Sequence, residues 1–242
     1  MSFTDNQKDT ISSQLVDRLR EEIISGKLIP GTKINLARIR EQFEISLSPL
    51  REALARLISD GLVEFQDNRG YWVSPVSIEN LGEITQLRVQ FESYALRLAI
   101  EAADILWEAD LLTALHRLKH AERNAARPET IELWENLHRD FHMALISGCK
   151  MPTLVRFCLQ LLNLNDRYRR VFLLKTSGDR SVNTEHSEIV ESALNHDATT
   201  ACAKLAEHLK RTGSNLKMHL QQHPGPLSFF SRKHRGDLNI DA

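Results

Sequence analysis

The chain has 242 residues, of which 42% are hydrophobic and 26% are charged, and its formal net charge at pH 7 is −1. This apolar content excludes a mainly disordered chain, and no apolar run approaches the roughly 20 residues of a membrane helix. The length predicts one large domain or two modest ones, and the near-neutral charge means that any nucleic-acid surface must be a local patch.

The N-terminal part of the chain predicts three short helices. Apolar residues recur at helical spacing over residues 11–24, and Asn35 can cap a second helix over residues 36–43. Ser48-Pro49 predicts the start of a third helix, because a hydroxyl N-cap is followed by proline at the first helical position. Asp60-Gly61 marks the end of that helix.

A β-hairpin is expected directly after the third helix. Residues 62–66 and 71–74 are strand-like, and the turn between them, Asp67-Asn68-Arg69-Gly70, contains the Asn and Gly that hairpin turns favour. Three short helices followed by a hairpin predict a winged helix-turn-helix over residues 1–76. The third helix would then be the recognition helix of a DNA-binding domain.

Candidate DNA-binding residues lie on the second and third helices and at the hairpin tip. Arg51 is in the first turn of the recognition helix, where a guanidinium can reach guanine or phosphate. The full candidate set is Arg38, Arg40, Ser46, Ser48, Arg51, Arg56, Arg69 and Gly70. The alternative is that these arginines are solvated surface charges, since residues 28–75 hold six basic and six acidic residues.

The remainder of the chain predicts a bundle of amphipathic helices. The expected helices span residues 78–102, 106–126, 129–147, 152–175, 183–194 and 198–221. A helix bundle can enclose a ligand pocket, and two DNA half-sites require two recognition helices, so we expect a mainly α protein with an all-α effector-binding and dimerisation domain over residues 77–222. Residues 223–242 contain a basic run and are expected to form a flexible tail.

Four histidines in this half have spacing that allows them to converge. His138 and His142 are four residues apart and share one helix face. His186 and His208 are equidistant from the turn at residue 197, so they lie at the same height in an antiparallel helix hairpin. Four imidazoles suit a late divalent metal, zinc or nickel, and the alternative is four separate surface histidines.

The N-terminal motifs resemble the GntR family of bacterial transcription regulators. The resemblance rests on five stretches, PGTKI at 30–34, ARIREQF at 37–43, SLSPLREALARL at 46–57, GLV at 61–63 and RG at 69–70. Two positions depart from the family pattern. Leu47 stands where many members have a DNA-contacting arginine, which leaves more of the readout to Arg51, and Glu44 stands where glycine is usual.

The helical half resembles the ligand-binding FCD domain of the FadR-type branch of this family. Members of that branch often bind a divalent metal through one Asp and three His, and they sense small carboxylates. The resemblance places the three His at His142, His186 and His208 and the Asp position at His138. The stretch SLSPLREAL at residues 46–54 and the run at residues 167–169 resemble those of members whose relatives respond to dicarboxylates of the glutarate type.

An effector carboxylate needs a donor beside the metal, and three residues are candidates for that role. Arg88 is the first choice because a guanidinium binds a carboxylate bidentately, although it could instead pair with Glu92 four residues on. Asn165 and Arg169 are the other candidates.

Together these patterns predict a ligand-responsive repressor that binds double-stranded operator DNA as a cytoplasmic homodimer. The three widely separated cysteines are typical of the reducing cytosol, and neither a membrane partner nor enzymatic activity is expected. The competing hypothesis is a metal-dependent enzyme on a helical scaffold. No placed catalytic acid or base, no H-E-x-x-H and no phosphate-binding glycine loop supports that alternative.

Overall fold

The computed structural model describes residues 11–102, 104–124, 126–172 and 182–222. The chain divides between Val76 and Ser77 into two compact units. None of the helices in the described ranges is long and apolar enough to cross a membrane. The predicted fold class, a winged helix-turn-helix followed by an all-α domain, is confirmed.

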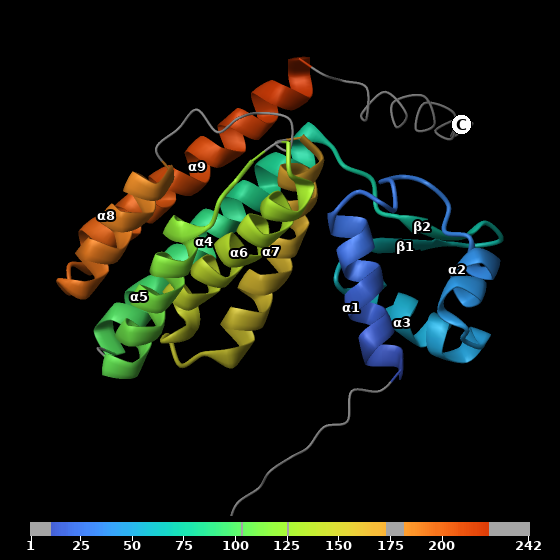
Figure 1. The fold of residues 1–242 in the computed structure, drawn as a ribbon, viewed down its shortest axis with the longest axis horizontal. Coiled ribbons are helices and arrows are strands. Elements are labelled where there is room, and N and C mark those ends of the chain that lie inside the picture. The colour runs from blue at the N-terminus through green and yellow to red at the C-terminus, as the bar shows by residue number, and fades with distance from the viewer. Residues whose placement is uncertain (1–10, 103, 125, 173–181, 223–242) are drawn as a thin grey trace, which may run out of the picture. The chain divides into compact units, whose positions relative to one another are not determined.

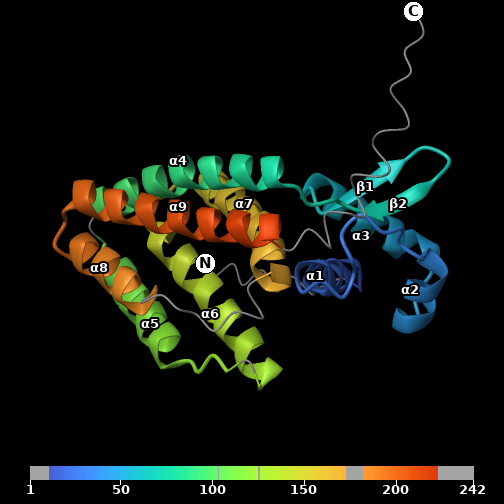
Figure 2. The same ribbon diagram turned by 90° about the horizontal axis from the view of Figure 1, so that it is seen from above.

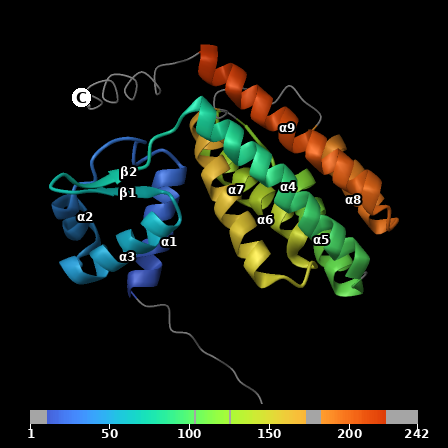
Figure 3. The ribbon, with the colours of Figure 1, turned by 180° about the vertical axis from the view of Figure 1, so that it is seen from behind.

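In its described residues, 11–76, the N-terminal unit holds three helices and one hairpin (Figure 3). These elements are α1 (Ile11–Ile24), α2 (Leu36–Phe43), α3 (Leu47–Ser59), β1 (Val63–Gln66) and β2 (Gly70–Val73). α1 packs along α3, and their apolar side chains, such as Leu19 and Leu54, are fully buried. The strands pair antiparallel, with Val63 opposite Val73. The capping role predicted for Asn35 is confirmed, because its side chain accepts a hydrogen bond from the backbone N–H of Arg38.

The predicted start of the third helix is wrong by two residues. Helix α3 begins at Leu47 with Ser46 in the N-cap position, so Pro49 occupies the third helical position. Proline is tolerated there because the first backbone N–H groups of a helix have no intrahelical acceptor. Glu44, at the end of α2, adopts a left-handed conformation with φ of 51°, which is the geometry that glycine usually supplies at such a position.

The C-terminal unit is a bundle of helices (Figure 1). The helices are α4 (Ile78–Ala102), α5 (Ile105–His120), α6 (Pro128–Ser147), α7 (Pro152–Phe172), α8 (Val182–Leu194) and α9 (Ala198–Gln222). The two longest, α4 and α9, lie side by side over most of their length (Figure 2). The apolar core between the helices includes Phe141, Leu145 and Leu205, each with no exposed surface.

Helix α5 ends six residues earlier than predicted. Its last residue is His120, and Ala121 is extended with φ of −75° and ψ of 126°. Asn124 then stabilises a turn, because its side-chain oxygen accepts from the backbone N–H of Ala126 and its backbone N–H donates to the Thr130 hydroxyl. Side-chain bonds to nearby backbone compete with a helix in this way. The predicted end of α7 at residues 173–175 and the expected tail at 223–242 lie outside the described residues.

Close approach of α4 and α9 depends on a glycine. A Cβ atom added at Gly213 would lie 2.6 Å from Thr85 Oγ1, whereas one added at Gly82 would meet nothing within 4 Å. We expect Gly213→Ala to lower the free energy of unfolding by about 1–3 kcal/mol, because overpacking forces the helices apart. The matched substitution Gly82→Ala should raise it by about 0.5–1 kcal/mol, because alanine favours a helix interior.

Urea unfolding followed by circular dichroism measures both changes. Equal stability of the two alanine variants would contradict this account of α4–α9 packing.

Candidate metal centre

The four histidines singled out by their spacing lie together inside the helical unit. His138 and His142 come from α6, His186 from α8 and His208 from α9, and each residue is at least 97% buried. One ring nitrogen from each residue lies within 4.8 Å of the others. Three helices therefore supply one buried set of imidazoles, called the histidine cluster below.

Local helix geometry explains the convergence. His138 and His142 are one turn apart on α6, and their ring centroids are 4.6 Å apart. His186 and His208 face each other across the α8–α9 hairpin, with their Nε2 atoms 3.4 Å apart. The turn of that hairpin closes at His196, which takes a left-handed conformation with φ of 57°.

Several ring nitrogens of the cluster have no hydrogen-bond partner among the described residues. These atoms are Nδ1 of His138, both nitrogens of His142 and Nδ1 of His186. The Glu92 carboxylate lies 3.4 Å from His142 Nδ1, but it does not form a hydrogen bond. Buried polar atoms without a partner are rare and costly, so each of these atoms points to a group that completes the site.

Burial keeps these imidazoles neutral. Desolvation lowers the pKa of His138, His142 and His186 well below the usual range. Nearby positive charge lowers the pKa further, from Arg169 for His138 and from Arg88 for His142. A neutral imidazole keeps one ring nitrogen with a free lone pair, which is the form that binds metal.

The spacing of the nitrogen atoms fits a divalent metal. Ligands held about 2.0–2.1 Å from a tetrahedral zinc ion lie roughly 3.4 Å from one another, which is also the separation of the His186 and His208 Nε2 atoms. The other donor atoms lie within 4.8 Å, so no pair has to close by more than about 1.4 Å. The unpartnered nitrogens and this spacing together make the cluster a suitable zinc or nickel site.

One side of the cluster is covered by α7. Arg169 donates from Nη1 to His138 Nε2 at 3.2 Å, and from Nη2 to both carboxylate oxygens of Glu135 at 3.1 and 3.2 Å. The indole of Trp134 stacks on His138, with the ring centroids 5.0 Å apart. Asn165 lies one turn before Arg169 and is 98% buried.

Of the three predicted effector-binding residues, Arg88 differs from the other two. Its guanidinium pairs bidentately with Glu92, at 2.5 and 3.2 Å, which is the alternative considered from the sequence. Asn165 Nδ2 and Arg169 Nε have no hydrogen-bond partner within the described part of the chain. The unpartnered donors among these three residues therefore come from α7 and not from α4.

The candidate residues chosen from the sequence did not include two carboxylates beside the cluster, Glu185 and Glu135. Glu185 accepts from His208 Nδ1 at 2.8 Å, and Glu135 holds Arg169. Glu135 lies three residues before His138 on α6, so helical spacing could have indicated it. Glu185 could have been noted because it precedes His186 and lies 23 residues before His208.

The predicted DNA-binding residues lie on α2, on α3, just before α3 and on the hairpin. Arg51 is exposed on the first half of α3, and Arg38, Arg40, Ser46 and Ser48 lie at least partly exposed at the surface. Arg56 is held by Glu52 and by Ser13. At the hairpin tip, the Arg69 guanidinium lies over the Trp72 ring at 5.3 Å, and Gly70 has φ of +86°.

Comparisons with known proteins match both units. Residues 11–73 match the family described as bacterial regulatory proteins, gntR family, and residues 83–211 match the FCD domain. The uncharacterized HTH-type transcriptional regulator BphR of Paraburkholderia xenovorans is 33% identical over 195 residues, which cover 80% of each chain. The HTH-type transcriptional repressor GlaR of Escherichia coli is 29% identical over 202 residues, covering 84% of this chain and 89% of that protein.

Solved structures share the fold. The Escherichia coli protein McbR/YncC superposes with a TM-score of 0.74 at 24% identity, covering 88% of this chain and 99% of that one. The relatives named here are transcription regulators, and none carries the name of an enzyme.

The buried neutral histidines make stability depend on pH. Below about pH 6.5 the unfolded chain binds protons at His138, His142 and His186, whereas the lowered pKa of each keeps the folded chain from doing so. The folded state is therefore fully stable in this respect above pH 6.5. As the pH falls below that value, the free energy of unfolding decreases by up to about 1.4 kcal/mol per pH unit for each histidine that stays neutral. Thermal unfolding in EDTA between pH 8 and pH 5.5 measures this dependence.

We expect His186→Gln to flatten the slope of melting temperature against pH. The control His120→Gln, at an exposed histidine, should leave the slope as in the wild type. An equal slope in the wild type and His186→Gln would contradict the assignment.

Proposed function

The chain belongs to the GntR family of bacterial regulatory proteins and carries an FCD domain, and on that premise we propose that it is a metal-dependent, carboxylate-sensing transcription repressor. It is a bacterial transcription regulator and not an enzyme. The assignment as a repressor follows the Escherichia coli relative, which is a repressor by name.

The observation that carries the proposal is the histidine cluster. Four buried imidazoles meet from three helices, and four of their eight ring nitrogens lack a partner among the described residues. A divalent metal would use lone pairs that are otherwise unsatisfied, and zinc and nickel both accept imidazole ligands. When bound, the metal would supply a positive centre that can attract an anionic effector.

Buried charge supports an anionic effector. Arg169 contacts His138, and the positive charges of Arg169 and Arg88 act on the histidines of the cluster. A metal bound by neutral imidazoles would add two positive charges, so a small carboxylate, and a dicarboxylate above all, would balance the site.

Asn165 and Arg169 are the residues we propose for the carboxylate. Their unpartnered Nδ2 and Nε donors lie one turn apart on α7, and Arg169 contacts His138 of the cluster. A carboxylate that takes hydrogen bonds from Arg169 competes with Glu135 for the guanidinium. Arg88 is a weaker candidate because Glu92 already occupies its donors.

DNA binding would use α3 and the hairpin of the N-terminal unit. Arg51 has the exposed position in α3 from which a guanidinium reaches base edges in the major groove. We propose a homodimer, because two half-sites about one helical turn apart require two recognition helices. An effector changes operator affinity only if it binds the DNA-competent and DNA-incompetent states with different affinity.

We expect Arg51→Ala to abolish specific operator binding while the protein stays folded, because the side chain is exposed. Loss of a bidentate contact to guanine costs about 1–3 kcal/mol per half-site. Fluorescence anisotropy with labelled upstream DNA measures the affinity, and Arg156→Ala, an exposed arginine on α7, is the control for loss of charge. Unchanged operator affinity in Arg51→Ala would show that the recognition surface is elsewhere.

The proposed function is tested by titrating glutarate against the protein–DNA complex in zinc or in EDTA. We expect glutarate to weaken binding about 5- to 150-fold with zinc and to have no effect in EDTA. Arg169→Met and His186→Ala should remove this response and keep ligand-free DNA binding, whereas the control Arg156→Met should keep both. If neither zinc nor glutarate changes the affinity of the protein for DNA, the assignment as a transcription regulator stands but the proposed carboxylate sensing is contradicted.

A further inference from the structure

We infer that Glu185 is a positioning residue that fixes the proton of His208 and thereby directs its Nε2 lone pair into the histidine cluster. This inference rests on the metal site proposed above. It gives Glu185, which is not among the metal or effector-binding candidates chosen from the sequence, a defined chemical task.

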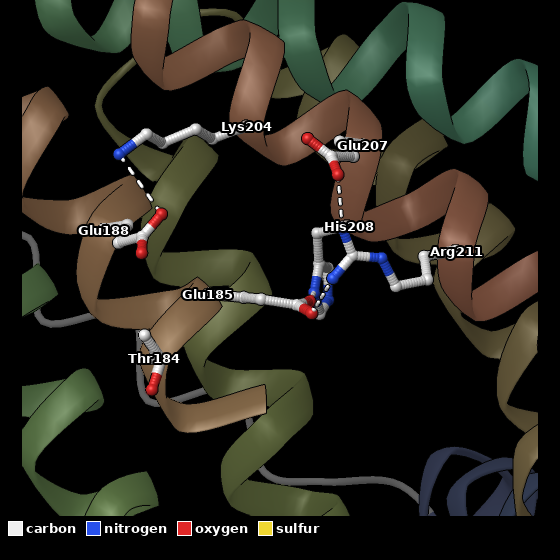
Figure 4. A pocket seen from close by; sticks show the side chains of 7 residues that line it. All are labelled: Thr184, Glu185, Glu188, Lys204, Glu207, His208 and Arg211. Carbon is white, nitrogen blue, oxygen red and sulfur yellow. Dashed lines mark hydrogen bonds and ion pairs between the residues drawn. The ribbon is translucent and has the colours of Figure 1, made fainter. Parts of the chain in front are cut away.

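The geometry around Glu185 is a chain of charged contacts. One carboxylate oxygen, Oε2, lies 2.8 Å from His208 Nδ1, and the other, Oε1, lies 2.5 Å from Arg211 Nη1. Arg211 in turn pairs with Glu207 four residues earlier on α9. Figure 4 shows the Glu185 side chain extending from α8 to the His208 ring and the Arg211 guanidinium.

The hydrogen bond decides which nitrogen of His208 carries the proton. A neutral imidazole has one N–H, and an ionised carboxylate only accepts hydrogen bonds. In the neutral form that binds metal, the proton of His208 therefore lies on Nδ1, and Nε2 carries the lone pair. Since Nε2 is the atom that lies 3.4 Å from His186 Nε2, the lone pair is directed at the place where the cluster converges.

Glu185 also provides negative charge beside the proposed metal ligands. The four candidate ligands are imidazoles, so the ligand set brings no negative charge to a divalent metal. The Glu185 carboxylate accepts a hydrogen bond from one of these ligands and so brings a negative charge next to the ligand set. Arg211 holds the second oxygen, which fixes the rotation of the carboxylate.

Glu185 lies at the boundary between the cluster and solvent. The His208 side chain is 2% exposed, that of Glu185 18% and that of Arg211 43%. Together with Thr184, Glu188, Lys204 and Glu207, these three residues line a pocket of about 340 Å³ (Figure 4). A change at Glu185 therefore removes little apolar packing, which makes its effect on the cluster separable from an effect on folding.

The test compares Glu185→Gln with Glu207→Gln. Both remove a carboxylate that contacts Arg211, but of these two only Glu185 has its carboxylate against the His208 ring. We expect Glu185→Gln to weaken zinc affinity about 10- to 100-fold by competition titration, and Glu207→Gln to stay within about twofold of the wild type. The ¹⁵N shifts of His208 in the metal-free protein should show an Nδ1 proton in the wild type and a mixture of tautomers in Glu185→Gln.

If Glu185→Gln does not fold, Glu185→Asp provides the second variant. It keeps the charge but shortens the side chain, so we expect weaker zinc binding and loss of the single His208 tautomer. Wild-type protein that binds no zinc would overturn the proposed metal site and this inference with it. A different result would overturn only the inference about Glu185. In that case the wild type binds zinc, the zinc affinity of Glu185→Gln stays within about twofold of the wild type, and the His208 proton remains on Nδ1 in the variant.

Discussion

The helical unit is organised around the need to satisfy four imidazoles that are buried away from water. Each ring brings two nitrogens into the bundle, and a buried nitrogen without a partner costs free energy. Protein groups satisfy some of these atoms: Glu185 accepts from His208, Arg169 donates to His138, and Nε2 of His186 meets Nε2 of His208. A divalent metal is the best chemical match for one ring-nitrogen lone pair from each of the four histidines.

The last described turns of α7 connect the cluster to the beginning of the helical unit. Arg169 contacts His138, while its fully buried neighbour Tyr168 accepts from the backbone N–H of Ser77 and lies 2.9 Å from Asn80 Oδ1. Ser77 also caps α4, because its hydroxyl accepts from the backbone N–H of Asn80. One stretch of α7 thus fixes both the proposed anion site and the first turn of α4.

Much of this structure could be predicted from the sequence because its signals are local. Helical periodicity indicated the helices, and the four-residue step from His138 to His142 and the equal distances of His186 and His208 from their turn indicated the convergence. The end of α5 could not be placed in this way, because side-chain bonds such as those of Asn124 compete with the helix there. The contacts of Arg169 with Glu135 and of Glu185 with His208 join separate helices, and no single-helix pattern determines which partner a charged side chain finds.

The central claim, that the buried imidazoles hold a divalent metal, is tested most directly by zinc K-edge X-ray absorption on the zinc-loaded full chain. The account predicts one zinc ion per chain, with nitrogen ligands about 2.0–2.1 Å away and the outer-shell scattering of several imidazole rings. Less than one bound zinc per chain, or a first shell of oxygen or sulfur without imidazole scattering, would contradict it.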